Sequence, residues 1–282
     1  MITCNLMGGL GNQLFQIFTT ISYAIKSKNK FEFLNLDKLG SGSTTIRSTY
    51  WNNFLSNLKP FLIEELPQPI HVINEKEFPY NELPVSEMIN TNVIIHGYFQ
   101  SYKYFEEYYD LIYRMLGIEK KKTELLTKLG FTNSILNNFI SMHFRVGDYK
   151  KIQHVHPLAT YEYYETGLLH IQKENPNKIF TIYYFCEDDD LEDVLQIVNP
   201  LFEKFPFYKF ERESNVLADW EQMLLMSCCH HNIIANSSFS WWSAYFNKWE
   251  DKIVCYPSIW FGPDIKHDTK DLCPFTFNSI IV

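Results

Sequence analysis

Strand-like and helix-like segments alternate along most of this chain, and the alternation restricts the fold more than any other feature of the sequence. Apolar, β-compatible runs at 138–144, 178–186 and 252–257 are separated by segments with helical spacing of apolar residues. A strand followed by a helix and another strand gives parallel sheets that are covered by helices. The sequence therefore predicts an α/β protein with parallel sheets.

A long helical stretch over residues 100–130 divides the alternating pattern into two halves. The chain has 282 residues, which suits two domains of roughly 130–140 residues each. We therefore expect two Rossmann-like domains, at 1–135 and 136–282. In the first half, strands are predicted at 2–7, 30–36 and 92–99.

Charge and composition exclude some classes of ligand and location. The net charge is −8 with a pI of about 5.6, and no basic block marks a nucleic-acid binder. Aromatic residues make up 17% of the chain, which favours either a bulky core or a carbohydrate or nucleotide ligand. No apolar run approaches the ~20 residues of a transmembrane segment, and the N-terminus lacks signal-peptide features. We expect a cytoplasmic protein whose six cysteines are mostly buried thiols.

Polar residues end the apolar run 138–144 in the segment HFRVGDY, residues 143–149. The carboxyl ends of strands are where open α/β sheets bind ligands. His143, Arg145 and Asp148 are therefore candidate site residues, with Arg145 as a fixed cation for a phosphate group. The alternatives are a strand end that only reaches solvent, and an Asp148 that only holds Arg145 in an ion pair.

An acidic segment, CEDDDLED, follows the strand predicted at 178–186. Its carboxylates suit Mg²⁺ or Mn²⁺ beneath a nucleotide diphosphate, or hydrogen bonds from a ribose. They equally suit the N-terminus of a helix, whose dipole favours negative charge. The residues concerned are Glu187, Asp188 and Asp190.

Hydroxyl groups mark a third junction, NSSFSWWSA at 236–244. Asn236, Ser237 and Ser238 lie at a predicted helix start, where free backbone N–H groups and hydroxyls can hold an anion. The alternative is an ordinary serine N-cap. The segment CCHH at 228–231 is not read as a metal site, because four consecutive residues cannot close a tetrahedron and no second pair follows.

The glycine-rich segment GGLGNQLFQ connects the first predicted strand to a helix. Gly9 and Gly11 allow close backbone approach to a ligand, and Asn12 and Gln13 can cap the helix or donate to a hydroxyl-rich ligand. The third glycine of a dinucleotide fingerprint is Leu14 here, so that motif is absent. The alternative is a tight turn without a ligand.

The segments GGLGNQLFQ, GYFQSYKYF, HFRVGDY, FCEDD and ANSSFSWWSA follow one another in this chain. In this order they resemble the inverting α-1,2-fucosyltransferases of glycosyltransferase family eleven, from residue 5 to about 260. The resemblance implies a GT-B-like architecture in which two Rossmann-like domains face across a cleft, residues 1–135 on the acceptor side and 136–282 binding the donor. It also implies transfer of L-fucose from GDP-fucose to the 2-hydroxyl of a terminal galactose-type acceptor, an oligosaccharide or glycan, with inversion and without a metal or other cofactor.

The resemblance also assigns roles to single residues. Arg145 corresponds to an arginine that grips the diphosphate, His143 to a residue near the guanine, and Asp219 to an acid that reads guanine or its ribose. Among the remaining matches, Glu187 and Asp188 stand near the ribose contacts, Asn236, Ser237 and Ser238 at the phosphate-binding hydroxyls, and Gly9, Gly11, Asn12 and Gln13 in the loop that closes on donor and acceptor.

One departure from the family pattern concerns Val146, which stands where the family has a second arginine. Three explanations are open: Lys150 or Lys151 replaces the missing cation, the affinity for the donor is weak, or the donor is a different one. If the arginine is simply missing, Val146→Arg tightens donor binding; otherwise the site is rebuilt around valine. For the general base, Asp148 is the first candidate, and His154 and His156 on the following loop are the next.

Two other function classes remain open from the sequence. One is a metal-dependent GT-A-type glycosyltransferase that uses the acidic cluster 187–190. The other is a non-catalytic nucleotide- or sugar-binding protein, suggested by Val146.

Overall fold

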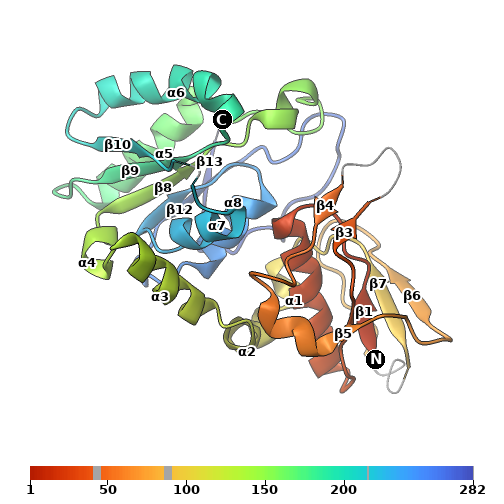
Figure 1. Ribbon diagram of the computed structural model, residues 1–282. Coiled ribbons are helices and arrows are strands. Elements are labelled where there is room, and N and C mark those ends of the chain that lie inside the picture. The colour runs from red at the N-terminus through yellow and green to blue at the C-terminus, as the bar shows by residue number, and fades with distance from the viewer. Residues whose placement is uncertain (41–45, 86–90, 215, 282) are drawn as a thin grey trace. The chain divides into compact units, whose positions relative to one another are not determined.

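The computed structural model describes residues 1–40, 46–85, 91–214 and 216–281, and the chain divides into two compact units (Figure 1). Unit 1 comprises Met1–Lys120 and His267–Pro274, and unit 2 comprises Lys121–Lys266 and Phe275–Val282. The sequence placed the boundary after residue 135, whereas the observed division falls within helix α3 (Ile118–Leu129). The later part of α3 is fixed inside unit 2 by two lysines: Lys122 donates to the carbonyl of Phe246 at 2.6 Å, and Lys128 to Glu221 at 2.8 Å.

Unit 1 contains a three-stranded parallel sheet in the order β1 (Ile2–Cys4), β7 (Val93–His96), β6 (His71–Asn74). Helix α1 (Leu10–Lys26) follows β1 and buries almost its whole length, including Leu14 and Phe18. Edge strand β6 is mostly exposed, so no apolar run announces it in the sequence. Two small sheets pair β2 (Phe33–Leu34) with β5 (Leu62–Ile63) and β3 (Lys38–Leu39) with β4 (Arg47–Ser48).

The stretch predicted as one helix from residue 100 is broken into short pieces. Two 3-10 helices, Tyr102–Tyr104 and Glu106–Tyr108, precede α2 (Tyr109–Met115). Gly117 follows α2, and its φ of +66° is a conformation that glycine adopts without steric cost. A further 3-10 helix covers Ser56–Phe61.

The segment His267–Pro274 is held in unit 1 by contacts with residues far earlier in the chain. Asp271 is the centre of these contacts: its carboxylate accepts from Lys103 Nζ at 2.5 Å and from the Tyr80 backbone N–H at 3.2 Å. Its carbonyl accepts from the Ser101 hydroxyl at 2.7 Å, and His267 stacks on Phe78 at 4.8 Å. The segment His267–Pro274 thus completes unit 1, although it follows most of unit 2 in the sequence.

Unit 2 contains a six-stranded sheet in which all pairings are parallel. The order is β10 (Lys209–Arg212), β9 (Thr181–Phe185), β8 (Phe139–His143), β11 (His231–Ile233), β12 (Val254–Pro257), β13 (Asn278–Ile280). Its helices are α4 (Asn133–Leu136), α5 (Tyr161–Glu174), α6 (Leu191–Lys204), α7 (Asp219–Met226) and α8 (Ser238–Phe246). The 3-10 helices Gly147–Lys151 and Asp188–Asp190 follow β8 and β9.

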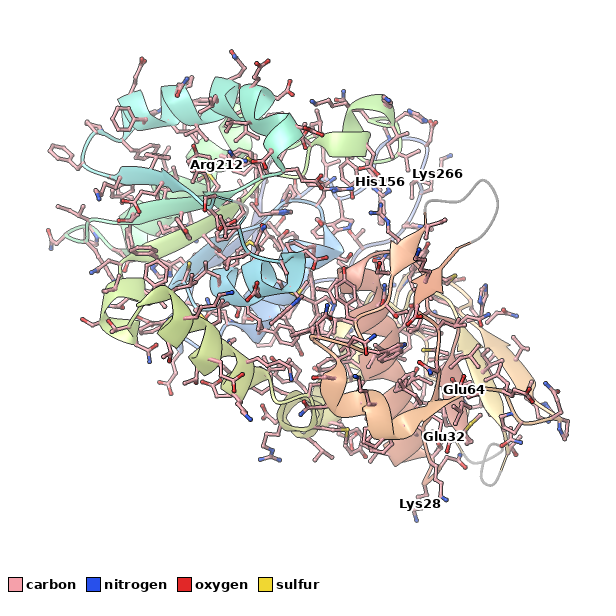
Figure 2. The ribbon with its side chains drawn as sticks, viewed as in Figure 1. Lys28, Glu32, Glu64, His156, Arg212 and Lys266 are labelled. Carbon is pink, nitrogen blue, oxygen red and sulfur yellow. The ribbon has the colours of Figure 1, made fainter. Side chains whose placement is uncertain are left out.

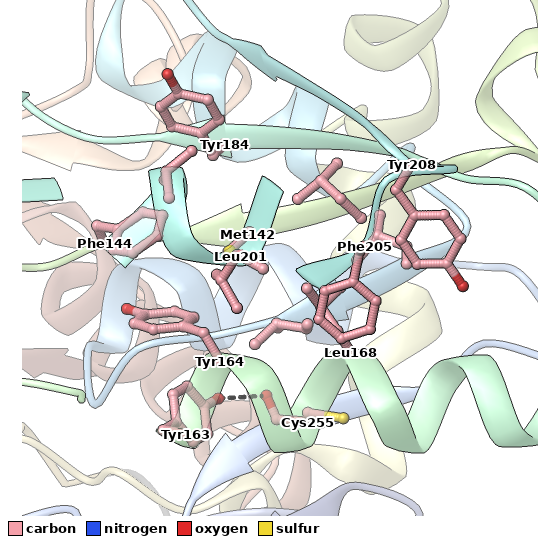
Figure 3. Close-up of a cluster of buried hydrophobic side chains, with 14 of the residues drawn as sticks. Met142, Phe144, Tyr163, Tyr164, Leu168, Tyr184, Leu201, Phe205, Tyr208 and Cys255 are labelled. Carbon is pink, nitrogen blue, oxygen red and sulfur yellow. Dashed lines mark hydrogen bonds between the residues drawn. The ribbon is translucent and has the colours of Figure 1, made fainter. Parts of the chain in front are cut away.

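Helices α5 and α6 cover one face of this sheet and form its main hydrophobic core with the strands, while α7 and α8 lie on the other face (Figures 1 and 3). Much of the aromatic content of the chain is buried here. Tyr163 is fully buried, and its hydroxyl contacts the carbonyl oxygens of Ile234 at 2.5 Å and Cys255 at 3.0 Å. The core therefore ties α5 directly to β11 and β12.

The order of the strands places a topological switch point beside β8. From β8 the chain moves outward to β9 and β10, then returns to β11 on the other side of β8. At such a point the loops after the two central strands diverge and leave a crevice where open α/β sheets bind ligands. The loops after β8 and β11 carry HFRVGDY and ANSS, so the two motifs meet at this edge.

The predicted α/β class with parallel sheets in both halves is confirmed. The six cysteines are free thiols, five of them buried, as predicted. Within the described part of the chain, no helix combines the length and hydropathy needed to cross a membrane.

Candidate active site

Arg145 lies two residues beyond β8 and is the central cation of the site. Its guanidinium donates to Asp148 at 2.5 Å and to Glu187 at 3.2 Å, and it lies over the ring of Tyr149, 5.0 Å from the centroid. The Arg145 side chain is 24% exposed, but the carboxylate side chains of Asp148 and Glu187 are 56% and 72% exposed. Because exposed ion pairs are weak, an incoming anion can replace these carboxylates.

Asp190 fixes the loop that follows Arg145. Its buried carboxylate accepts from the backbone N–H of Gly147 at 2.6 Å and pairs with Lys150 at 3.2 Å. Lys150 pairs with Asp193 as well. Lys150 is thus occupied in holding the loop, which leaves it poorly suited to replace the second arginine of the family pattern. Lys151 is exposed on the same loop.

Val146 points into the core of unit 2. Its side chain is 8% exposed and belongs to the cluster that contains Phe144, Tyr164 and Tyr184. The position of the second arginine therefore faces apolar side chains in this chain. The structure favours the view that the site is rebuilt around valine.

Arg212, the last residue of β10, pairs with Asp188 at 2.5 Å (Figure 2). Two arginines thus engage two consecutive carboxylates at the end of β9, Arg145 with Glu187 and Arg212 with Asp188. Arg212 is not among the residues predicted from the sequence, because the apolar run before it ends at Phe210. A cation at the carboxyl end of a correctly bounded strand would have been the signal.

The alternative metal site would use the carboxylates of Asp188 and Asp190. Both accept from cations or backbone N–H groups, namely those of Arg212, Lys150 and Gly147. Among residues 1–40, 46–85, 91–214 and 216–281, no group of three or more His, Cys, Asp and Glu side chains is placed to hold a metal ion. The buried carboxylate of Asp190 is therefore committed to the loop, whereas that of Asp188 is exposed and pairs with Arg212.

The junction after β11 has a more structural character than the sequence indicated. Ser237 is the N-cap of α8 and accepts from the Phe239 N–H at 3.3 Å, as the alternative reading expected. The buried amide of Asn236 donates to the carbonyls of Pro157 at 2.9 Å and Trp260 at 3.1 Å. Ser238, the first residue of α8, is half-buried and is the hydroxyl at the helix N-terminus with most access to a ligand.

His143, at the end of β8, has a buried ring 5.6 Å from that of Phe239, and its Nδ1 has no hydrogen-bond partner. Burial, with a smaller effect of Arg145, lowers the pKa of His143 to about 3, so the imidazole is neutral. Burial likewise lowers the pKa of His231, at the start of β11, to about 3. His231 and His230 stack on each other in the segment CCHH, with ring centroids 3.9 Å apart.

Because of His143 and His231, we expect the stability of the fold to fall in acid. Their folded pKa values lie below the ordinary 6.5, so the unfolded chain binds more protons and stability is lost as the pH falls from 6.5 toward 3. The free energy of unfolding, measured with denaturant, should be clearly lower near about pH 5 than near about pH 7. His231→Asn, which keeps an acceptor for the Ile253 N–H, should reduce this slope; an unchanged slope would assign the effect to other groups.

Asp219 is the first residue of α7 and is exposed. Its carboxylate accepts from the backbone N–H of Trp220 at 2.7 Å. Since α7 follows β10, its N-terminus lies at the same edge of the sheet as the ends of β8 and β9. This position is compatible with contact to a nucleotide.

The glycine-rich loop of unit 1 is held by its own polar side chains. Gln13 is buried and donates to the carbonyls of Gly8 and Ser48, each at 3.0 Å, while Asn12 accepts from Gln100 at 2.8 Å. Gly8, with φ of +74°, is the residue that requires glycine. Gly9 is the N-cap of α1 in extended backbone with open space around it, and Gly11 is a buried residue of the first turn. Gln13 is thus a structural residue, and Asn12 is the more accessible of the two amides.

Residues 1–261 match the model of glycosyl transferase family 11. The chain belongs to this family. The membership predicted from the five sequence segments is confirmed, and with it the activity of a glycosyltransferase.

Two proteins of Escherichia coli are similar to this family 11 chain over nearly their full length. An alpha-1,2-colitosyltransferase is 26% identical over 293 residues, which cover 97% of this chain and 97% of that protein. The O-antigen biosynthesis glycosyltransferase WbnK is 26% identical over 302 residues, covering 94% and 96%.

Solved structures similar to the chain are also glycosyltransferases. A variant of Arabidopsis thaliana FUT1 in complex with GDP has a TM-score of 0.49 at 10% identity, over 93% of this chain and 72% of that one. Heptosyltransferase II of Escherichia coli has a TM-score of 0.38 at 13% identity, over 57% and 43%. The chain is α/β, with a parallel sheet in each of its two units.

Proposed function

We propose that this protein transfers L-fucose from GDP-fucose to the 2-hydroxyl of a galactose-type acceptor, with inversion and without a metal ion. The observation that carries the proposal is the position of Arg145 after β8, at the switch point of the unit 2 sheet. The neighbouring strand β11 leads to Ser238 at the start of α8. Family membership supports the reaction class, and the colitosyltransferase relative supports an α-1,2 linkage.

In such a transfer the acceptor hydroxyl oxygen forms a bond to the anomeric carbon while the bond from that carbon to the diphosphate breaks. Negative charge grows on the departing GDP. A cation held in place and the N–H groups at a helix N-terminus stabilise this charge without reorganising during the reaction. Arg145 is the cation in this scheme, and α8 with Ser238 supplies the helix N-terminus.

The ion pairs around Arg145 also support a diphosphate ligand. The carboxylates of Asp148 and Glu187 are more than half exposed, so their exchange for phosphate oxygens costs little. Asp148 is engaged with Arg145 at 2.5 Å while no donor is bound. Its replacement by phosphate oxygens would release this carboxylate, so Asp148 stays the first candidate for the general base.

The nature of the donor is tested by ligand binding and turnover. GDP and GDP-fucose should raise the melting temperature through mass action, whereas UDP-sugars should not. The colitosyltransferase relative makes colitosyl transfer the second candidate, so turnover should be compared for GDP-fucose and GDP-colitose. Activity that is abolished by excess EDTA would instead support the metal-dependent alternative.

Asp219→Asn is expected to weaken GDP binding about tenfold and to reduce the preference for GDP over UDP, because a carboxylate accepts two donors from guanine whereas an amide does not. Calorimetric titration with both nucleotides measures the effect. The matched control is Glu203→Gln, which changes an exposed carboxylate near the C-terminal end of α6. Unchanged affinity and selectivity in Asp219→Asn would remove this residue from the site.

A further inference from the structure

Three aromatic rings of unit 2 form a connected cluster next to Arg145. The guanidinium carbon lies 5.0 Å from the centroid of Tyr149. Tyr149 is stacked on His156, with centroids 4.7 Å apart and planes inclined by 13°, and His156 contacts Phe261 at 5.7 Å. We call Tyr149, His156 and Phe261 the ring cluster; its members come from two separate loops.

The two loops that supply the ring cluster are locked together by hydrogen bonds. The Tyr149 hydroxyl donates to the carbonyl of Asn236 at 3.3 Å, and the Asn236 amide binds the carbonyls of Pro157 and Trp260. The Gly262 N–H donates to the carbonyl of Val155 at 2.8 Å. A Cβ on Gly262 would lie 2.3 Å from the carbonyl oxygen of His154, so the two backbones are in direct contact. The ring cluster is therefore a fixed surface.

The ring cluster is also uncharged, which suits it to hold a cation. Burial raises the pKa of Tyr149, so its phenol stays protonated. Burial lowers the pKa of His156 more than Asp148 raises it, so the imidazole is neutral at neutral pH. A neutral aromatic face attracts a guanidinium, whereas an imidazolium stacked behind it would oppose that attraction.

The remaining partners of Arg145 are the exposed carboxylates of Asp148 and Glu187. A diphosphate competes with both of them for the same N–H groups. The contact with the ring of Tyr149 involves neither carboxylate, so the ring stays beside the guanidinium when the N–H groups turn to phosphate.

On this basis we propose that Tyr149 and His156 are positioning residues for the proposed transfer reaction: the ring of Tyr149, with His156 stacked on it, holds the guanidinium of Arg145 so that its N–H groups point at the donor diphosphate. The inference rests on the proposed function, in that it takes GDP as the nucleotide of the donor.

Four variants test the proposal: Tyr149→Phe, Tyr149→Leu, His156→Phe and His156→Leu. Both phenylalanine variants keep a ring and should retain most of the activity. Both leucine variants should lower kcat for GDP-fucose about tenfold, with a smaller change in KM and a similar loss of GDP affinity. Melting temperatures of the same preparations identify any variant that is not folded.

A double-mutant cycle separates positioning from a general structural role. In an Arg145→Ala background, Tyr149→Leu should cause no further loss of GDP affinity, because the residue that it positions is already gone. This comparison is informative even where the leucine variant is less stable, since both arms carry the same destabilisation.

Several outcomes would overturn the proposal. An inactive but folded His156→Phe would show that an imidazole nitrogen is needed, which indicates proton transfer and not positioning. Equal activity in all four variants, or fully additive losses in the cycle, would equally refute it. If the wild type binds GDP but transfers no fucose, the proposed function fails alone and the GDP affinities still decide this inference; if the wild type does not bind GDP, both fail.

Discussion

Arg145→Ala is expected to lower transfer activity on the order of 10²-fold or more, by analogy with the removal of one transition-state donor, while the melting temperature stays close to that of the wild type. The ion pairs of Arg145 involve exposed carboxylates and contribute little to stability. The loss should appear in kcat as well as in KM, because charge on the diphosphate rises toward the transition state. Steady-state kinetics and thermal unfolding of one preparation measure both quantities.

Arg145→Lys sharpens the same experiment. Lysine keeps the charge but loses the planar fork that contacts two phosphate oxygens, and with it the guanidinium that lies over the ring of Tyr149. It should fold normally and still lose most of the activity. Lys209→Ala removes an exposed ion pair at the first residue of β10 and is the matched control. A lower melting temperature with nearly normal kcat in Arg145→Ala would mean that Arg145 is only a structural partner of Asp148.

Val146→Arg is expected to destabilise the protein by at least about 2 kcal/mol, because it forces a cation into an apolar cluster that has no partner for it. Denaturant unfolding measures the loss. GDP affinity of the folded fraction should not rise, since the new side chain has no path to the ligand through the core.

A control variant separates charge from volume at this position. Val146→Leu adds volume without charge and should cost clearly less, within the about 1–3 kcal/mol of ordinary overpacking. A stable Val146→Arg variant with tighter GDP binding would instead show that the second arginine of the family is simply missing here.

The periodic apolar pattern was sufficient to predict the α/β class, the parallel sheets and the polar ends of β8, β9 and β11. Strands β6 and β13 were missed, because β6 is a mostly exposed edge strand and β13 is a three-residue edge strand near the end of the chain. Their pairing depends on partners that local sequence does not reveal.

The site was predicted less completely than the fold, because residue type does not give orientation. Val146 lies on the loop immediately after a strand, and only the backbone there decides that its side chain enters the core. Asn236 and Gln13 have the chemistry of ligand contacts, but they satisfy backbone carbonyls of their own units. Arg212 was missed because the apolar run before it ends at Phe210, two residues before the end of β10.

The segment His267–Pro274 has a consequence for how the chain is made. Asp271 is the hydrogen-bond acceptor for Lys103, Ser101 and the Tyr80 backbone, but it is synthesised about 170 to 190 residues after them. Domains usually fold as they leave the ribosome, the N-terminal one first. Here the first unit cannot be completed before the main part of unit 2, up to Lys266, has been synthesised, because its last piece follows that part in the sequence. The second unit in turn still lacks strand β13 at that moment, so a nascent chain stopped at residue 266 carries two unfinished units.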